Sequence, residues 1–88
     1  MGKYRYICFV KWAGPPTEDW LKKHGELAEK YGLKISYRGT VFGVPEDSVL
    51  IYKGDTPVDK YRDFRVESYD GDVIDHSNTV ISVKAPES

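Results

Sequence analysis

Residues 4–12, YRYICFVKW, constrain the fold more than any other stretch of this sequence. β-Branched and aromatic residues dominate the segment, which predicts a strand, and Gly14-Pro15-Pro16 then breaks the pattern. Side chains of a strand alternate between its two faces. One face therefore holds Tyr6, Cys8, Val10 and Trp12, and the other holds Ile7 and Phe9. Both faces are apolar in the middle, which is typical of a central strand that is covered on both sides.

A helix is predicted next, from about residue 17 to residue 31. Thr17 is a suitable N-cap, and Glu18 and Asp19 place carboxylates in the first turn, where the helix dipole favours them. An apolar stripe at helical spacing follows, and it consists of Trp20, Leu21, His24, Leu27, Ala28 and Tyr31. Gly32 fits the left-handed position after the last turn. We therefore expect this stripe to pack against the sheet.

The rest of the chain predicts three more strands and a second helix. Residues 33–42 alternate in polarity like an edge strand, in which Gly39 marks a bulge, whereas residues 48–52 are apolar on both faces like a second central strand. Thr56 as N-cap and Pro57 at the first helical position open a helix that ends near residues 65–68. Residues 64–69 also alternate like a strand, so a hairpin over residues 64–77 is the alternative. Residues 78–84 are predicted as the last strand, with Thr79, Ile81 and Val83 facing inward, and residues 85–88 as a frayed tail.

The predicted order β-α-β-β-α-β is the ferredoxin-like arrangement of an α+β fold, with a four-stranded antiparallel sheet and both helices on one face. Its right-handed crossovers place the first and third strands in the centre. The other face would then expose an apolar band, which monomers rarely do. With 88 residues, we predict one domain, residues 1–88, with a core over about residues 3–84.

The chain resembles the dimeric α+β-barrel superfamily in the order of its elements, in its size and in its two strands that are apolar on both faces. This superfamily includes antibiotic-biosynthesis monooxygenases and many small proteins of unknown role. The resemblance implies a two-fold homodimer through the helix-free face of the sheet. It also implies a pocket between the sheet and the helices, since several members bind or transform small hydrophobic, often aromatic, molecules. Members share no single catalytic set, so the resemblance assigns no catalytic residue.

Composition argues against several classes of partner. A formal net charge of −1 removes the electrostatic attraction on which nucleic-acid binding depends. The RNA-recognition fold has the same strand order, but residues 46–51 carry acids and aliphatics where its basic-Gly-aromatic signature belongs. No apolar run is long enough to span a membrane. A single cysteine, Cys8, excludes an intrachain disulfide and fits a cytoplasmic location.

His24 is the polar residue of most interest, because it lies on the apolar stripe of the first helix. It is predicted either to be a hydrogen-bonded histidine at a packing seam or to contact a ligand in a pocket. Aromatic residues are available to line such a pocket, namely Tyr6, Trp12, Trp20, Tyr37 and Tyr52. The same residues can instead fill a small core and its interface.

Other polar clusters suggest no chemistry. Asp70, Asp72, Asp75 and His76 lie in one acidic loop, but their spacing matches neither a calcium loop nor a zinc site. We therefore predict no metal and no cofactor. The function predicted is a non-catalytic homodimeric module that binds a small ligand or a partner. The alternative is a small cofactor-free oxygenase or isomerase, which a pocket bordered by His24 would favour.

Overall fold

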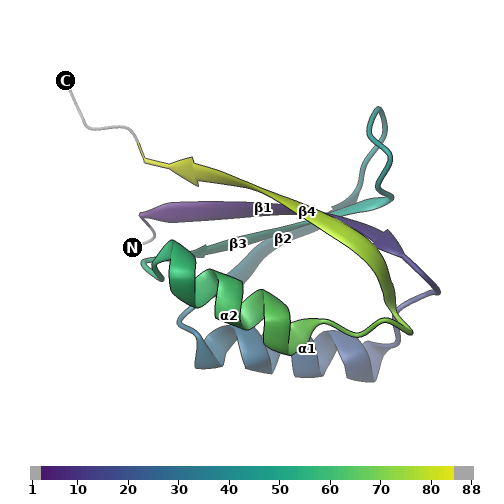
Figure 1. Ribbon diagram of the computed structural model, residues 1–88, viewed down its shortest axis with the longest axis horizontal. Helices are drawn as coiled ribbons and strands as arrows, with labels where there is room; N and C mark the ends of the chain where they lie inside the picture. Colours follow the sequence, from purple (N-terminus) through teal and green to yellow (C-terminus); the bar gives the residue numbers. More distant parts are fainter. Residues whose placement is uncertain (1–2, 85–88) are drawn as a thin grey trace.

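The computed structural model describes residues 3–84, so the predicted tail at 85–88 lies outside the described residues. The elements follow the predicted β-α-β-β-α-β order (Figure 1). They are β1 (Tyr4–Trp12), α1 (Glu18–Lys30), β2 (Lys34–Thr40), β3 (Ser48–Gly54), α2 (Val58–Ser68) and β4 (Ile74–Val83). No helix within the described part of the chain is long and apolar enough to cross a membrane.

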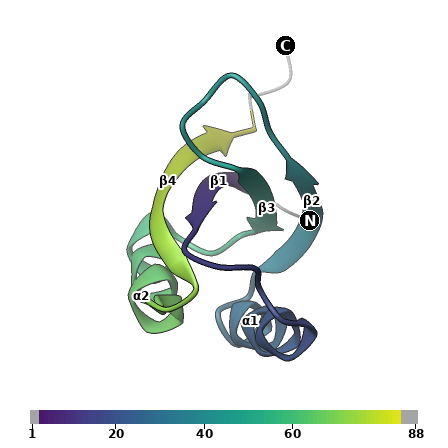
Figure 2. The ribbon, with the colours of Figure 1, turned by 90° about the vertical axis from the view of Figure 1, so that its right-hand side faces the viewer.

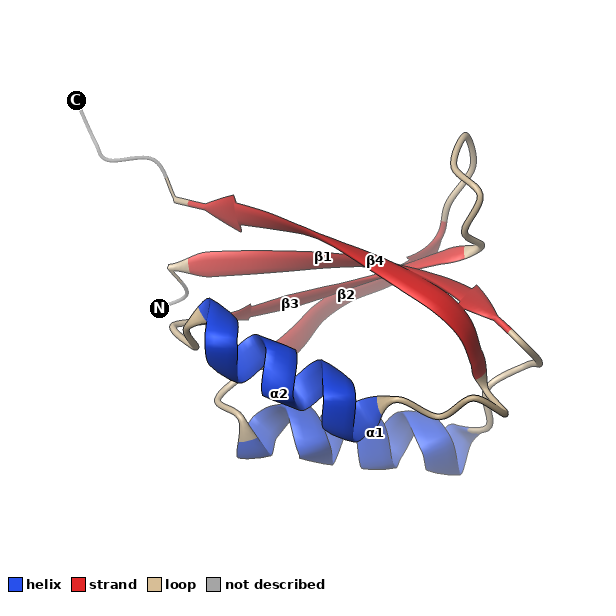
Figure 3. Cartoon of the chain, viewed as in Figure 1, coloured by secondary structure: helices blue, strands red, loops and turns tan. Residues whose placement is uncertain are grey.

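The four strands form one antiparallel sheet in the order β2-β3-β1-β4. This order and the crossovers define the ferredoxin-like fold, and the prediction that the first and third strands lie in the centre is confirmed. Both helices lie on the same side of the sheet, as the end-on view shows (Figure 2). Within residues 3–84 the opposite side carries no helix, and the loop between β2 and β3 rises from it at one end (Figure 3).

The core lies between the sheet and the two helices. On the helix-facing side of the central strands, Tyr6 pairs with Tyr52 and Cys8 pairs with Leu50, and all four side chains are buried. Ala28 of α1 and Phe64 of α2 pack against them. The core is rich in aromatic rings, since Tyr6 stacks on Tyr61 of α2 with the ring centroids 4.0 Å apart.

The helix-free face carries an apolar band, which we call the sheet patch: Ile7 and Phe9 of β1, Tyr37 of β2, Ile51 of β3 and Val80 of β4. Ile7, Phe9 and Ile51 are half-buried. Tyr37 and Val80 are 56% and 55% exposed. The apolar band expected from the strands that are apolar on both faces is therefore present.

The structure corrects the prediction for β2. The bulge lies between Ile35 and Tyr37, not at Gly39. One extra residue turns all following side chains to the other face, because side chains alternate with a period of two. Ile35 pairs with Tyr52 on the helix side, whereas Tyr37 pairs with Ile51 on the helix-free side.

In the second half of the chain, the structure decides between two alternatives and corrects two details of the prediction. The helix reading of residues 64–69 is right and the hairpin reading is wrong, since α2 continues to Ser68. Thr56 is not the N-cap, because its hydroxyl donates to the carbonyl oxygen of Tyr31 at 2.6 Å and the cap position falls on Pro57. β4 begins at Ile74 rather than at residue 78. Its three residues predicted to face inward, Thr79, Ile81 and Val83, do lie on the helix side, since they pair with Cys8, Tyr6 and Tyr4. Ile81 and Val83 are nevertheless exposed on this edge strand.

Candidate functional site

Helix α1 carries the residue around which the candidate site forms, His24. The helix begins as predicted, with the Thr17 hydroxyl accepting a hydrogen bond from the Trp20 amide at 3.1 Å. After its last turn Gly32 adopts a positive φ of 76°. Trp20, His24 and Leu27 follow at helical spacing, so one face of α1 presents all three toward α2 and the sheet. His24 is only 4% exposed.

The imidazole of His24 lies among aromatic rings. The Trp20 ring stacks on it nearly in parallel, with centroids 4.8 Å apart, and the Phe64 ring lies at 5.3 Å. Its Nε2 shares a hydrogen bond of 2.5 Å with the hydroxyl of Tyr52. Burial, and then the positive charge of Arg65, lower the pKa of His24 to about 4. His24 is therefore neutral at pH 7.

Tyr52 supports His24 from the central strand β3. Its side chain is fully buried, and burial raises the pKa of its hydroxyl well above the usual value. The hydroxyl thus keeps its proton, and the bond to His24 joins two neutral groups. This hydrogen bond gives the buried imidazole nitrogen and the buried hydroxyl a partner each.

Replacing Tyr52 with phenylalanine tests this bond. The variant keeps the ring and removes the hydroxyl, so it leaves Nε2 of the buried His24 without its partner. We expect the free energy of unfolding to fall by about 1–3 kcal/mol, the cost of an unsatisfied buried polar group. Urea denaturation at pH 7 measures it. The control is Tyr37→Phe, which removes an exposed hydroxyl and should change little; equal stabilities for both variants would show that the bond contributes nothing.

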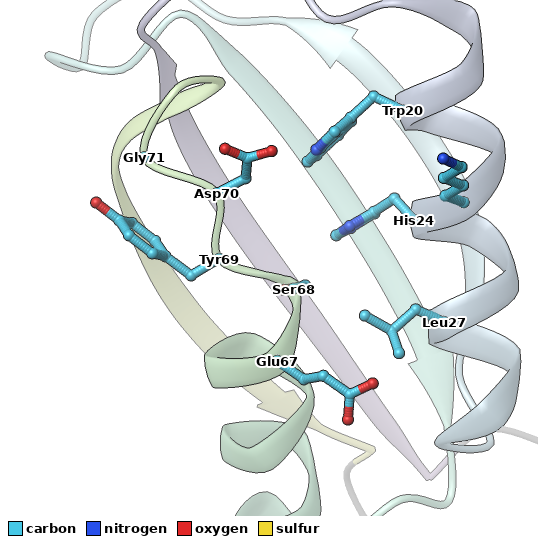
Figure 4. Close-up of a pocket in the computed structure, with 9 residues that line it drawn as sticks. Trp20, His24, Leu27, Glu67, Ser68, Tyr69, Asp70 and Gly71 are labelled. Atoms are coloured by element: carbon cyan, nitrogen blue, oxygen red, sulfur yellow. The ribbon is translucent and has the colours of Figure 1, made fainter.

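A groove opens beside His24 between α1 and the end of α2. We call it the His24 groove, and its volume is about 420 Å³. Its lining residues are Trp20, Lys23, His24 and Leu27 from α1, and Glu67, Ser68, Tyr69, Asp70 and Gly71 from the end of α2 and the following turn. Trp20, His24 and Leu27 point from α1 toward this turn, whereas the ring of Tyr69 points away from α1 (Figure 4).

The wall opposite α1 is acidic but already hydrogen-bonded. The carboxylate of Glu67 accepts from the Tyr31 hydroxyl at 2.6 Å and from Lys30 Nζ at 3.3 Å. These bonds link α2 to α1. The carboxylate of Asp70 accepts from the amide of Asp72 at 3.0 Å, which shapes the turn before β4. Both acids thus have structural roles at the edge of the groove.

The six residues predicted as site candidates do not meet in one pocket. His24 and Trp20 line the groove, and Tyr52 lies beneath them. Tyr6 is buried in the core beside Tyr52 and does not line the groove, and its hydroxyl donates to the carbonyl oxygen of Thr56 at 2.5 Å. Trp12 touches Trp20 edge-on but lines a second groove with Arg38 and Thr40. Tyr37 is on the other face of the sheet, because of the β2 bulge.

The sequence did not indicate the second wall of the groove. Residues 67–71 carry no motif, and only their packing opposite α1 brings them to the site. Leu27 was identified as a member of the apolar stripe, but not as a groove residue. The helical spacing of Trp20, His24 and Leu27 is the one signal that could have marked the α1 wall.

The acidic loop is dispersed by the fold. Asp75 and His76 belong to β4, where His76 Nε2 lies 3.0 Å from the Glu46 carboxylate and Nδ1 lies 3.2 Å from Asp75. Hydrogen bonding to Asp75 and then to Glu46 raises the pKa of His76. Within residues 3–84, no group of three or more acidic, histidine or cysteine side chains is placed to hold a metal ion.

No protein-family model matches this sequence, and no curated protein is similar to it at a significant level. Among solved structures, the crystal structure of an AsnC family transcriptional regulator from Agrobacterium tumefaciens is similar, with a TM-score of 0.59 and 12% identity. The match covers 99% of this chain and 54% of the regulator, so the chain spans about half the regulator's length. A dimeric ferredoxin-like protein of unknown function from Thermobifida fusca has a TM-score of 0.46 and 16% identity, over 92% of this chain and 90% of that one. At such identities the likeness to the regulator shows the fold alone, and it agrees with the ferredoxin-like fold predicted from the sequence.

Proposed function

We propose that this chain is a single ferredoxin-like domain that forms a homodimer and binds a small apolar or aromatic ligand, without catalysis, in the His24 groove. The observation that carries the ligand proposal is the neutral, buried imidazole of His24 at the border of an open groove. Trp20 and Leu27 supply apolar contact area there, and His24 supplies a polar group that can orient a ligand. A cytoplasmic location agrees with the single, buried and free cysteine, Cys8.

The sheet patch supports the homodimer. Its five residues lie on the face that no helix covers, and Val80 and Tyr37 extend the band to both edge strands. A second copy presents the same patch, so a two-fold axis allows the two patches to cover each other. The His24 groove is lined by α1 and by the end of α2. Both helices lie on the side of the sheet away from the sheet patch (Figure 2), so the groove stays open in such a dimer.

Two features favour binding over catalysis. A general base works best when its pKa lies near the working pH, and the pKa of His24 is about 4. In addition, Nε2 of His24 is occupied by Tyr52 and the carboxylate of Glu67 by Tyr31 and Lys30. The alternative, a small cofactor-free enzyme, is favoured by one observation: His24 borders a groove whose opposite wall carries Glu67 and Asp70.

The ligand proposal is tested with 2-naphthol, an uncharged aromatic probe with one hydroxyl. Titration followed by two-dimensional NMR should shift the amide signals of Trp20, His24 and Ser68. Leu27→Ala removes about 1–2 kcal/mol of apolar contact, so it should weaken binding roughly tenfold. The matched control is Phe42→Ala, which truncates an apolar side chain that is 91% exposed on the β2–β3 loop.

Two results would contradict the proposal. One is binding that Leu27→Ala leaves unchanged, and the other is a set of shifted signals outside the groove. Native mass spectrometry of the purified protein adds an independent measurement, because a co-purified small molecule that is released by Leu27→Ala identifies the ligand directly. Turnover of such a molecule that is lost in His24→Gln but not in Phe42→Ala would favour the enzyme alternative.

A further inference from the structure

Nδ1 of His24 is the imidazole nitrogen that is left for a ligand in the His24 groove. The other nitrogen, Nε2, is hydrogen-bonded to the Tyr52 hydroxyl at 2.5 Å. Nδ1 has no hydrogen-bond partner among residues 3–84, and it is not sealed off from solvent. The His24 side chain points from α1 toward the turn after α2 (Figure 4). The chemistry of a ligand in the groove therefore depends on whether Nδ1 carries a proton.

Arg65 determines the direction of the hydrogen bond between Tyr52 and His24. Arg65 is hydrogen-bonded to the same Tyr52 hydroxyl, and a guanidinium has donors only. The Tyr52 oxygen therefore accepts from Arg65. If His24 donated to this oxygen as well, the buried hydroxyl proton would have no acceptor. Buried donors in native proteins nearly always have a partner, so the Tyr52 hydroxyl donates to Nε2 of His24.

The direction of this bond fixes the tautomer of His24. A neutral imidazole carries one proton, and the nitrogen that accepts a hydrogen bond is the one without it. His24 is neutral at pH 7, because burial and then the charge of Arg65 lower its pKa to about 4. Since Nε2 accepts from Tyr52, the proton is on Nδ1. The His24 groove therefore contains an N–H donor.

The other residues of the groove favour an uncharged aromatic ligand. The ammonium of Lys23 and the carboxylates of Glu67 and Asp70 line the groove, so an anion gains no net attraction there. Trp20 and Leu27 supply apolar contact area. An uncharged aromatic molecule with one hydrogen-bond acceptor, such as a ketone oxygen or a pyridine-type nitrogen, matches this combination of groups.

We infer that His24 is a specificity-determining residue, whose Nδ1–H selects uncharged aromatic ligands with a hydrogen-bond acceptor over ligands that offer only a donor. The inference rests on the ligand site proposed at the His24 groove. A donor-only ligand would turn its own N–H toward Nδ1–H, and both donors would stay unpaired. Arg65 and Tyr52 act as positioning residues, because they hold the proton on Nδ1 without lining the groove.

The first measurement is the tautomer of His24 in the free protein. Long-range ¹H–¹⁵N correlation spectra distinguish a protonated ring nitrogen from an unprotonated one by its ¹⁵N chemical shift. They are recorded at pH 7 in His76→Gln, which leaves His24 as the one histidine of the sequence. We expect the proton on Nδ1, whereas a proton on Nε2 would overturn the inference whether or not the groove binds a ligand.

Tyr52→Phe in the same background tests the positioning role. Nε2 then accepts no hydrogen bond from Tyr52, so part of the proton should move from Nδ1 to Nε2. A proton that stays entirely on Nδ1 would contradict this role of Tyr52.

The second measurement compares the affinity of two bicyclic aromatic probes at pH 7. Quinoline has a ring nitrogen that only accepts, and indole has an N–H that only donates. Titration followed by NMR should show that quinoline binds at least about fivefold more tightly, because a donor that loses its partner costs that factor or more. His24→Phe keeps an aromatic ring and removes Nδ1, so it should abolish the preference.

The control variant is Lys23→Met, because the Lys23 ammonium is another donor that lines the groove. It should retain the preference for quinoline. Equal binding of both probes to the wild type, or a preference that Lys23→Met removes and His24→Phe retains, would overturn the inference while the ligand site stands. Failure of both probes to bind in the groove would contradict the ligand site itself, and with it the inference that rests on that site.

Discussion

Replacement of Phe9 with lysine is expected to convert the protein from a homodimer to a monomer. Phe9 belongs to the part of the sheet patch on the central strand β1, between Val49 of β3 and Asn78 of β4, and it faces away from the helices. Sedimentation equilibrium at micromolar concentration should give about twice the monomer mass of 10.1 kDa for the wild type and 10.1 kDa for the variant. A buried ammonium group without a partner is the physical reason, because its desolvation cost exceeds what the interface gains.

The free energy of association expected from the patch corresponds to a stable but not very tight dimer. Burying a few hundred Å² of the patch on each partner at about 25 cal/mol per Å² is worth ~10 kcal/mol before the cost of association. That cost is several kcal/mol, so the loss of one central apolar contact and the gain of a buried charge suffice to separate the partners.

The control is Val66→Lys, which puts the same charge on an exposed apolar position of α2, on the helix side. It should remain dimeric. Leu50→Lys is unsuitable, since Leu50 faces the helices and is buried in the core. A wild-type protein that sediments as a monomer, or a Phe9→Lys variant that remains a dimer, would contradict the proposed interface.

Acid is expected to destabilise the fold through His24. In the unfolded chain a histidine has a pKa near 6.5, whereas the pKa in the folded state is about 4. Between these values the unfolded state binds more protons, so stability falls as the pH falls. The contribution is fully present above pH 6.5 and is lost progressively down to about pH 4, with a total on the order of 3 kcal/mol.

Urea denaturation at pH 7 and pH 5 measures this effect before most carboxylates take up protons. His24→Gln should remove the dependence on pH in this window, whatever its effect on absolute stability. His76 has the opposite sign: its pKa is raised, so its contribution is present below pH 6.5 and is lost as the pH rises through its folded value. The comparison is therefore made in a His76→Gln background. Equal slopes with and without His24 would show that His24 is already accessible to protons in the folded state.

The sequence was sufficient for the order of the elements and for the two central strands. Residues 4–12 and 48–52 are apolar on both faces, and this local property is enough to place both strands inside a sheet. The stripe of α1 likewise predicted which side of the helix is buried, because helical spacing alone puts Trp20, His24 and Ala28 together. His24 was therefore recognised as a candidate before its surroundings were known.

Which residues lie on the helix side and line the His24 groove depended on tertiary structure. A bulge in β2 turned Tyr37 to the other face of the sheet, and no local signal distinguished Ser36 from Gly39 as its position. Residues 67–71 became the second wall of the His24 groove only because α2 packs beside α1. Arg65 of α2 likewise reaches the hydroxyl of Ser77 only because α2 packs beside β4.

Local sequence therefore determined the order of the strands and helices and the apolar faces of β1, β3 and α1. Side-chain periodicity is a property of neighbouring residues, so it can be read without knowing the rest of the fold. The grooves were decided by tertiary structure, because they lie where residues from different elements meet. Their lining depends on strand register and helix packing, and a shift of one residue in either changes which side chains face each other.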